Sequence, residues 1–481
     1  MDSKNLTLLT DFYELTMMNG YLRHGRKDEV AVFDVFFRQN GIITYSLACG
    51  LDQVIDYVLN LHFDEEDIRY LESLKSFDKE FLDYLKNFSF SGDIYAVPEG
   101  TMVFPGEPIL TVKAPVMEAQ LVETAILNIV NFETLIASKA AKVCYAAKGD
   151  AVMEFGLRRA QAPDAGIYGA RAAVIGGCAS TSNVLAGKMF GIPVSGTHAH
   201  SWVMNFKDEY TAFLEYAKIY PDNALLLVDT YDTLKSGVPN AIKVFDVLKK
   251  EGYNPKGIRL DSGDLAYLSK KARKMLDDAG YPDAKICASG DLDEYLIESL
   301  KNQGACIDFW GVGTKLITSA DMPALGGVYK LSAVYENGKE IPKIKVSDNE
   351  AKITNPGFKN IYRVYDKKTG KAEADCIVLR SEEKVDESKP LVLTHPTYRW
   401  KTIEFTDYRV RYLQEEIFKA GKLVYKRPSL SEIQAYTKSE LDSFWDEYKR
   451  LDSPHLFKVD LSDKLYELKK SMLESLRSIK K

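Results

Sequence analysis

The chain has 481 residues, of which 46% are hydrophobic and 27% charged, and its formal net charge is −6. This is the composition of a folded globular protein long enough for about two or three domains. The acidic balance argues against nucleic-acid binding, which needs a basic surface. The six cysteines lack the spacing of a zinc site or a disulfide framework, and no segment has the roughly 18 apolar residues of a membrane span. We therefore expect a cytoplasmic protein with neither nucleic-acid nor membrane partners.

Residues 1–148 are predicted to form an N-terminal α/β domain. Its expected elements are the helical segments 6–24, 52–87 and 118–148, the apolar strand "VAVFDVFF" (30–37) and a hairpin over 92–115. The helical segments show apolar residues at helical spacing, and the hairpin is rich in β-forming residues broken by Pro and Gly.

Residues 149–334 show a different rhythm, in which short apolar strand-like runs alternate with helical stretches. The runs are 151–155, 192–195, 224–228, 257–260, 285–289, 306–310 and 328–334, with a weaker one at 175–180, and the helices include 240–251, 265–279 and 292–303. Such alternation predicts a parallel sheet of βαβ units, and this number of strands favours an irregular, TIM-like α/β barrel. A doubly wound open sheet is the alternative, because strand order cannot be read from one sequence.

Residues 335–481 are predicted to be a C-terminal extension with strands in "KNIYRVYD" and "ADCIVLR" and a polar amphipathic helix at its end. The sequence leaves open whether this extension packs on the N-terminal domain or on the barrel.

Polar or glycine-rich chain follows almost every strand of the barrel region. The segments are "GLRRAQAPDAG" after residue 155, "GTHAH" after 195, "DTYDT" after 228, "DSGD" after 260, "GDLD" after 289 and "GVGT" after 310. The loops at the carboxyl ends of parallel strands converge on one face of a barrel or an open sheet. We therefore expect these six loops to build a single site.

Two kinds of group in these loops are suited to anions. The short glycine loops 289–293 and 311–314 could hold a phosphate with their backbone N–H groups. Arg158, Arg159 and Arg259 could bind carboxylate or phosphate through the planar guanidinium. Arg259 and Asp261 occupy alternate positions of one strand, so both should point to the same side.

The acidic residues fall into two groups. Asp232 and Asp264 are best interpreted as helix N-caps. Asp229, Asp261 and Asp291 follow strands, where carboxylates could hold Mg²⁺ on a polyphosphate or orient a histidine.

His198 and His200 stand two residues apart in "GTHAHSW". With Asp229 they could form a metal site. One of them could instead be a nucleophile or acid–base group oriented by Asp229, while the other is a hydrogen-bonded core residue. The residues alone leave the metal and the nucleophile open.

The motifs together closely resemble the nicotinate phosphoribosyltransferase family. They are "LLTDFYELTMMNGYLRHG", "EFGLRRAQAPDAG", "GTHAHSW", "LLLVDTYDT", "IRLDSGDL", "DFWGVGT" and "KITNPGFKNIYRVYD", which run in order over most of the chain. The resemblance implies a type II phosphoribosyltransferase: an α/β barrel, an additional N-terminal α/β domain, a C-terminal extension and a homodimer. It also implies that nicotinate and phosphoribosyl pyrophosphate give nicotinate mononucleotide and pyrophosphate, with ATP as co-substrate and Mg²⁺ as cofactor, in NAD salvage.

The resemblance also assigns roles to individual residues. The phosphorylated histidine of the family falls on His200, with Asp229 orienting it and Asp261 as a further catalytic acid, while His198 occupies a variable position of the motif. The implied nicotinate site is Tyr13 (reaching in across the dimer), Arg158, Thr197 and Arg259. The implied phosphoribosyl and phosphate site is Arg159, Ser289, Gly290, Asp291, Gly311, Gly313 and Thr314.

Two alternatives remain at this stage. The substrate could be another pyridine, nicotinamide or quinolinate. The protein could also be a metal-dependent barrel lyase or hydrolase that uses His198, His200 and Asp229.

Overall fold

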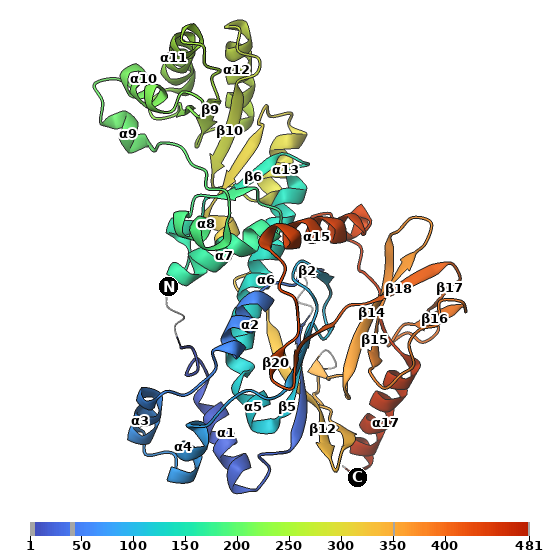
Figure 1. The fold of residues 1–481 in the computed structure, drawn as a ribbon. Coiled ribbons are helices and arrows are strands. Elements are labelled where there is room, and N and C mark those ends of the chain that lie inside the picture. The colour runs from blue at the N-terminus through green and yellow to red at the C-terminus, as the bar shows by residue number, and fades with distance from the viewer. Residues whose placement is uncertain (1–4, 39–43, 350–351, 480–481) are drawn as a thin grey trace. The chain divides into compact units, whose positions relative to one another are not determined.

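The computed structural model describes residues 5–38, 44–349 and 352–479 (Figure 1). The chain divides into two compact units, one made of residues 1–135 with 324–481 and the other of residues 136–323. The first unit thus contains both ends of the chain, and the second is a continuous central segment. No helix of the described ranges is both long enough and apolar enough to cross a membrane.

The first unit is built on a seven-stranded sheet with the order β13-β12-β1-β5-β3-β19-β20, in which neighbouring strands run antiparallel. Its strands are β1 (Val30–Phe37), β3 (Asp93–Ala96), β5 (Leu110–Pro115), β12 (Gly327–Glu336), β13 (Lys339–Pro342), β19 (Glu415–Lys419) and β20 (Lys422–Leu423). The N-terminal helices are α1 (Phe12–Arg23), α2 (Leu51–Leu59), α3 (Glu65–Ser73), α4 (Lys79–Leu85), α5 (Val116–Leu121) and α6 (Glu123–Ala146), the last of which continues into the second unit. These elements confirm the strand at 30–37 and the helical segments expected in the N-terminal region.

The C-terminal region also forms a four-stranded sheet with the order β18-β14-β15-β21. The remaining elements of this unit are β2 (Ser46–Leu47), β4 (Met102–Val103), β14 (Lys359–Asp366), β15 (Ala372–Leu379), β16 (Leu391–Thr394), β17 (Thr402–Phe405), β18 (Tyr408–Tyr412), β21 (Val459–Leu461), α15 (Leu430–Asp442), α16 (Asp446–Lys449) and α17 (Asp463–Ile479). The fully buried Arg363 of β14 forms ion pairs with Asp375 of β15 (2.6 Å) and Glu440 of α15 (3.0 Å), and it donates to the Met102 carbonyl (2.6 Å). The C-terminal strands and this buried network join the C-terminal region to the N-terminal one.

Replacing the buried Glu14 of α1 by glutamine should change how stability depends on pH. Burial raises the pKa of Glu14 to about 7, although the Gln120 amide donates a hydrogen bond to the carboxylate. A raised folded-state pKa means that stability is greatest below the ordinary carboxyl pKa and declines as pH rises toward 7. Glu14→Gln should therefore gain about 1–2 kcal/mol over the wild type at pH 8 and almost nothing at pH 4.5. Thermal unfolding at both pH values measures this, and equal pH dependence of the two proteins would contradict it.

The second unit contains a six-stranded parallel sheet with the order β7-β6-β11-β10-β9-β8. Its strands are β6 (Ala151–Glu154), β7 (Ser180–Thr181), β8 (Leu225–Leu227), β9 (Gly257–Leu260), β10 (Lys285–Gly290) and β11 (Phe309–Val312). The helices are η1 (Leu157–Arg159), α7 (Pro163–Ile175), α8 (Val184–Phe190), α9 (His200–Met204), α10 (Glu209–Ile219), η2 (Thr233–Gly237), α11 (Val238–Lys250), α12 (Leu265–Asp278), α13 (Glu294–Asn302) and α14 (Thr314–Ile317). The parallel α/β architecture predicted for this region is thus confirmed.

Two helices of this unit, α12 and η2, begin at the capping acids that the sequence predicts. Asp264 accepts a hydrogen bond from the Tyr267 N–H at the start of α12, and Asp232 accepts one from the Leu234 N–H at the start of η2. Each carboxylate satisfies an N–H group that the first helical turn leaves without a partner. The N-cap interpretation of these two acids is confirmed.

The closed barrel expected from the sequence is not found. The strand predicted at 192–195 is reduced to one parallel bridge between Val194 and Thr181, and in the described chain the outer strands β7 and β8 do not pair with each other. Pro193 has no N–H to donate, and glycine follows at 196, so this segment supports little strand pairing. The run at 328–334 also departs from the expectation: it lies in β12, which pairs with β1 in the first unit. The sheet of the second unit is therefore open.

Candidate active site

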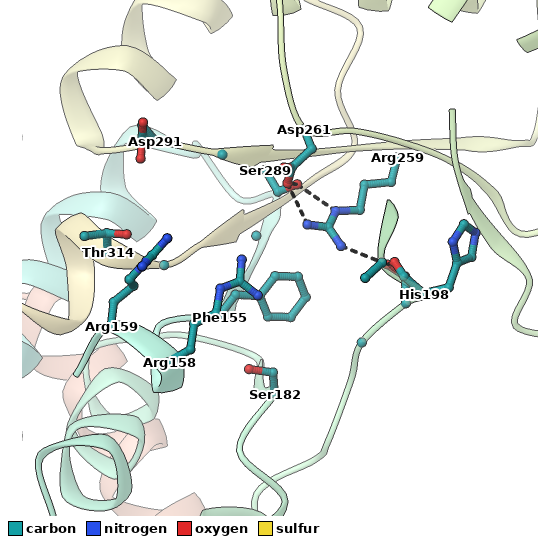
Figure 2. A pocket seen from close by; sticks show the side chains of 16 residues that line it. Phe155, Arg158, Arg159, Ser182, His198, Arg259, Asp261, Ser289, Asp291 and Thr314 are labelled. Carbon is teal, nitrogen blue, oxygen red and sulfur yellow. Dashed lines mark hydrogen bonds and ion pairs between the residues drawn. The ribbon is translucent and has the colours of Figure 1, made fainter. Parts of the chain in front are cut away.

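A cavity of about 380 Å³ lies where the strands of the second unit end (Figure 2). Its walls include residues that end or directly follow β6, β7, β9, β10 and β11, together with the 196–199 segment. Five of the six predicted loops therefore line this cavity, while the loop after β8 lies beside it, with Asp229 accepting a hydrogen bond from the Asp261 N–H. The volume is suited to a small-molecule ligand.

Arg259 of β9 is the centre of a polar network in this cavity. Its guanidinium donates from Nε to Ser289 Oγ (2.7 Å) and from Nη2 to Asp261 Oδ1 (2.6 Å), as Figure 2 shows. It also donates from Nη1 to Thr197 Oγ1 (2.9 Å). Burial alone would raise the pKa of Asp261, but the Ser289 hydrogen bond and the Arg259 charge outweigh it and hold the pKa below its ordinary value. Asp261 is consequently ionised at neutral pH, and Arg259 is held rigidly for an incoming anion.

Two glycines allow the strand ends to approach closely. Gly290 has φ +114°, and a Cβ there would lie 2.7 Å from the Asp261 carbonyl oxygen. A Cβ on Gly311 would lie 2.6 Å from the ring of Phe155. Any larger residue would push these strand ends apart, so both positions require glycine.

Arg158 and Arg159 belong to η1 and line the same cavity. Both are exposed, and within the described ranges neither guanidinium has a hydrogen-bond or ion-pair partner. Their donors are therefore available to an anionic ligand. Asp291, Gly313 and Thr314, which the sequence also assigns to the site, contribute to the wall as well.

His200 begins α9 and stands next to two carboxylates. Its Nδ1 lies 3.1 Å from Thr230 Oγ1, and its Nε2 lies 4.0 Å from Asp229 Oδ1 and 3.9 Å from Asp261 Oδ2. The orienting hydrogen bond expected from Asp229 is thus absent, and Thr230 supplies the contact instead. Asp229 accepts from the Asp261 N–H (2.9 Å) and from Ser262 Oγ (2.6 Å), and these hydrogen bonds fix its carboxylate.

His198 has different neighbours from His200. Its Nε2 accepts a hydrogen bond from the Leu227 N–H (3.2 Å), and the residue is 7% exposed. A shared metal site with His200 and Asp229 is therefore not formed. In the described part of the chain the one His, Cys or acid cluster with metal-compatible spacing is Cys49, Glu99 and Glu133. The metal-dependent lyase or hydrolase interpretation thus loses its ligand set.

Sequence reasoning missed Phe155 and Ser182 of the cavity wall, although both directly follow strands and the strand-end rule could have found them. It also missed Thr230, the contact of His200, which follows Asp229. His200 and Asp229 stand beside Asp261 but are not among the described residues that line the cavity. Tyr13 belongs to α1 of the first unit and is 47% exposed, so its part in nicotinate binding stays a prediction.

Arginines, glycine turns and carboxylates at the carboxyl ends of parallel strands are typical of α/β proteins that bind small phosphorylated ligands. Comparison with known families agrees with this class. The models of the nicotinate phosphoribosyltransferase N-terminal domain, family and C-terminal domain match residues 8–131, 151–372 and 358–469 respectively. The chain belongs to the nicotinate phosphoribosyltransferase family.

Individual relatives cover nearly the whole chain. The nicotinate phosphoribosyltransferase of Bacillus subtilis (strain 168) is 48% identical over 480 residues, which is 98% of this chain and 96% of that protein. The crystal structure of human nicotinic acid phosphoribosyltransferase superimposes with a TM-score of 0.85 at 30% identity, over 96% of this chain and 99% of that one. A nicotinate-nucleotide pyrophosphorylase structure from Pyrococcus furiosus shares the fold, with a TM-score of 0.68 at 23% identity over 92% and 97% of the two chains.

Proposed function

We propose that this protein transfers the phosphoribosyl group from phosphoribosyl pyrophosphate to nicotinate, giving nicotinate mononucleotide and pyrophosphate for NAD salvage, with coupled ATP hydrolysis. The observation that carries the proposal is the Arg259 network with Thr197, Asp261 and Ser289 in one cavity with Arg158 and Arg159. Several independent cationic donors suit two anionic substrates, a pyridine carboxylate and a polyphosphate. The names of the relatives support the same reaction.

The substrates are assigned to different parts of the cavity. Arg259, Thr197 and Arg158 receive the nicotinate carboxylate, with Tyr13 of the partner subunit completing the ring site in a homodimer. Arg159 and the turns at Ser289–Asp291 and Gly311–Thr314 receive the ribose phosphate and pyrophosphate, because their N–H groups and positive charge match phosphate oxygens.

The transfer separates charge, and the proposed site matches that charge pattern. Breaking the bond between ribose C1 and pyrophosphate leaves positive charge on the sugar and negative charge on the leaving group. The ionised Asp261 stabilises the positive centre, and the arginines stabilise the leaving group.

His200 is proposed to take the terminal phosphate of ATP. With Nδ1 held by Thr230, the lone pair of Nε2 attacks phosphorus, the bond to ADP breaks, and water later releases phosphate from the ring. Phosphorylation adds negative charge and hydrogen-bond acceptors, which reorganise the surrounding loops and strengthen binding of phosphoribosyl pyrophosphate. Each turnover thus consumes one ATP and one water.

Mg²⁺ fits the acidic side of this site. Asp229 is buried, its Oδ1 has no hydrogen-bond partner among the described residues, and Asp261 offers a second ionised carboxylate near His200. Hard carboxylate oxygens of this kind are the ligands that Mg²⁺ prefers, so Asp229 and Asp261 would hold it. When bound, the ion would offset the repulsion between these carboxylates and substrate phosphates.

The decisive experiment is pyrophosphate release from the purified protein with phosphoribosyl pyrophosphate and Mg²⁺. Nicotinate, nicotinamide and quinolinate are offered separately, each with and without ATP. Release that requires nicotinate and rises with ATP is expected. Release with nicotinamide or quinolinate alone would move the substrate assignment to that pyridine, and no release with any of them would reject the proposed function. A single species of twice the chain mass in light scattering would support the homodimer.

Replacing Arg159 by alanine should weaken binding of phosphoribosyl pyrophosphate. The side chain is exposed and without a protein partner in the described structure, so its loss should leave the fold intact. We expect the KM for phosphoribosyl pyrophosphate to rise about 5- to 10-fold, with a smaller effect at high salt, because an exposed charge is screened. Lys207→Ala, which removes an exposed charge of the same unit, is the matched control. An unchanged KM in Arg159→Ala would contradict the assignment.

A further inference from the structure

The second unit has an open seam between the segment 192–199 and strand β8. On one side this segment pairs with Thr181 of β7 through two backbone hydrogen bonds, from the Thr181 N–H to the Pro193 carbonyl (3.1 Å) and from the Ser195 N–H to the Thr181 carbonyl (3.0 Å). On the other side, within the described chain, no backbone ladder reaches β8. The seam is the place where a barrel would have closed.

Strand β8 nevertheless has backbone groups that face the seam. The Val228 N–H donates to the Arg259 carbonyl of β9 (3.1 Å). Successive N–H groups of a strand point to opposite sides, so the N–H of the preceding residue, Leu227, points away from β9. Leu227 is 1% exposed, and a buried N–H without an acceptor is costly. The acceptor at this position is a side chain, Nε2 of His198, at 3.2 Å.

The environment of His198 keeps the ring in the form that can accept. The ring packs edge-on against Tyr216 with 4.8 Å between centroids and lies 6.0 Å from the ring of Phe213. Burial lowers the pKa of His198 to about 4, so the ring is neutral at physiological pH. Since Nε2 accepts the Leu227 hydrogen bond, the proton of the neutral ring is assigned to Nδ1, which is buried without a hydrogen-bond partner in the described structure.

The segment held in this way forms part of the substrate cavity. Thr197, next to His198, accepts the hydrogen bond from Arg259 Nη1, and His200 begins α9 two residues later. Gly196 and Thr197 also line a second cavity, whose other walls include Val194, Tyr216 and Lys256. A shift of the segment toward that second cavity would withdraw Thr197 from Arg259. Figure 2 shows the His198 ring turned away from the Arg259 guanidinium.

We propose that His198 is a positioning residue that replaces the missing strand pairing across the seam and thereby holds Thr197 against Arg259 in the substrate cavity. It does not touch the reacting atoms. We name nicotinate as the ligand whose binding depends on His198, and this assignment rests on the proposed function above.

The test compares His198→Phe, which keeps an aromatic ring without an acceptor, with His198→Gln, whose amide oxygen can replace Nε2. Hydrogen exchange of the Leu227 amide, measured without substrate, should be at least about tenfold faster in His198→Phe than in the wild type and close to wild type in His198→Gln. The KM for nicotinate should rise about tenfold in His198→Phe, with kcat within about threefold, and His198→Gln should restore it.

Several outcomes would overturn the proposal. They are wild-type exchange at Leu227 in His198→Phe, an unchanged KM in an active His198→Phe enzyme, and a His198→Gln variant no better than His198→Phe. If His198→Phe does not fold, the wild-type protein labelled with ¹⁵N at histidine decides: protonated Nδ1 and unprotonated Nε2 support the proposal, and a protonated Nε2 overturns it. A wild-type enzyme inactive with nicotinate would reject the proposed function, while the exchange data would still decide whether His198 closes the seam.

Discussion

Replacing His200 by alanine should abolish ATP hydrolysis and leave a slow, ATP-independent transfer of the phosphoribosyl group. The ring nitrogen Nε2 is the proposed nucleophile, and no other described histidine stands beside Asp229 and Asp261. Alanine removes the nucleophile but leaves Arg259 and its network in place. We expect ATP turnover to fall by at least about 10³-fold, the usual scale for loss of a covalent nucleophile.

The measurement is phosphate release from ATP together with nicotinate mononucleotide formation in the same sample. Labelled ATP should also leave an acid-labile phosphate on the wild-type protein and none on His200→Ala. His198→Gln is the matched control, because it alters the neighbouring imidazole and should keep the label. Continued ATP turnover in His200→Ala would remove His200 from the role.

Replacing Arg259 by alanine should cost the enzyme most of its activity toward nicotinate. The substitution removes three hydrogen bonds and a positive charge from a site where the side chain is 14% exposed. It also leaves Asp261 without its ion-pair partner, which raises the pKa of that carboxyl toward its ordinary value. We expect kcat/KM for nicotinate to fall on the order of 10²–10³-fold, the scale of a lost charge-assisted contact in a shielded site.

Arg259→Lys separates charge from geometry, because lysine keeps the positive charge but cannot donate to three partners at once. It should recover about a tenth of the lost activity or more, with a raised KM. Lys235→Ala, at a side chain 88% exposed in the same unit, controls for loss of a charge. Wild-type kcat/KM in Arg259→Ala would show that the carboxylate binds elsewhere.

The sequence predicted correctly those features that depend on neighbouring residues of the chain. The alternation of Arg259 and Asp261 on one strand places both in the same network, and the 2.6 Å contact between them agrees with that prediction. The N-cap positions of Asp232 and Asp264 also depend only on the following helical turn. Loops after parallel strands meet at one edge whatever the order of the strands, so the site could be located without knowing the topology.

The errors concern pairing between distant segments. The apolar run at 328–334 reads as one more barrel strand, but its partner is β1, about 300 residues earlier in the chain. The sequence of β12 alone cannot show this, because a short apolar run is compatible with a strand in either sheet. The roles of His198 and His200 were likewise undetermined, since the Leu227 N–H that engages His198 lies on another strand.

The first unit is made from both ends of the chain and the second from one continuous segment, and this division has a consequence for biosynthesis. Residues 136–323 are complete as soon as they leave the ribosome, so their open sheet can form while translation continues. Strand β1 can pair with β5 early, but its other edge must wait for β12, because Val30 also pairs with Tyr335. During that interval the unpaired backbone edge of β1 is exposed to other nascent chains, and completion of the sheet in the first unit is delayed by a long loop closure. Strand β1 is thus synthesised early but is among the last strands to complete its pairing. Chaperones would therefore be needed most by the first unit.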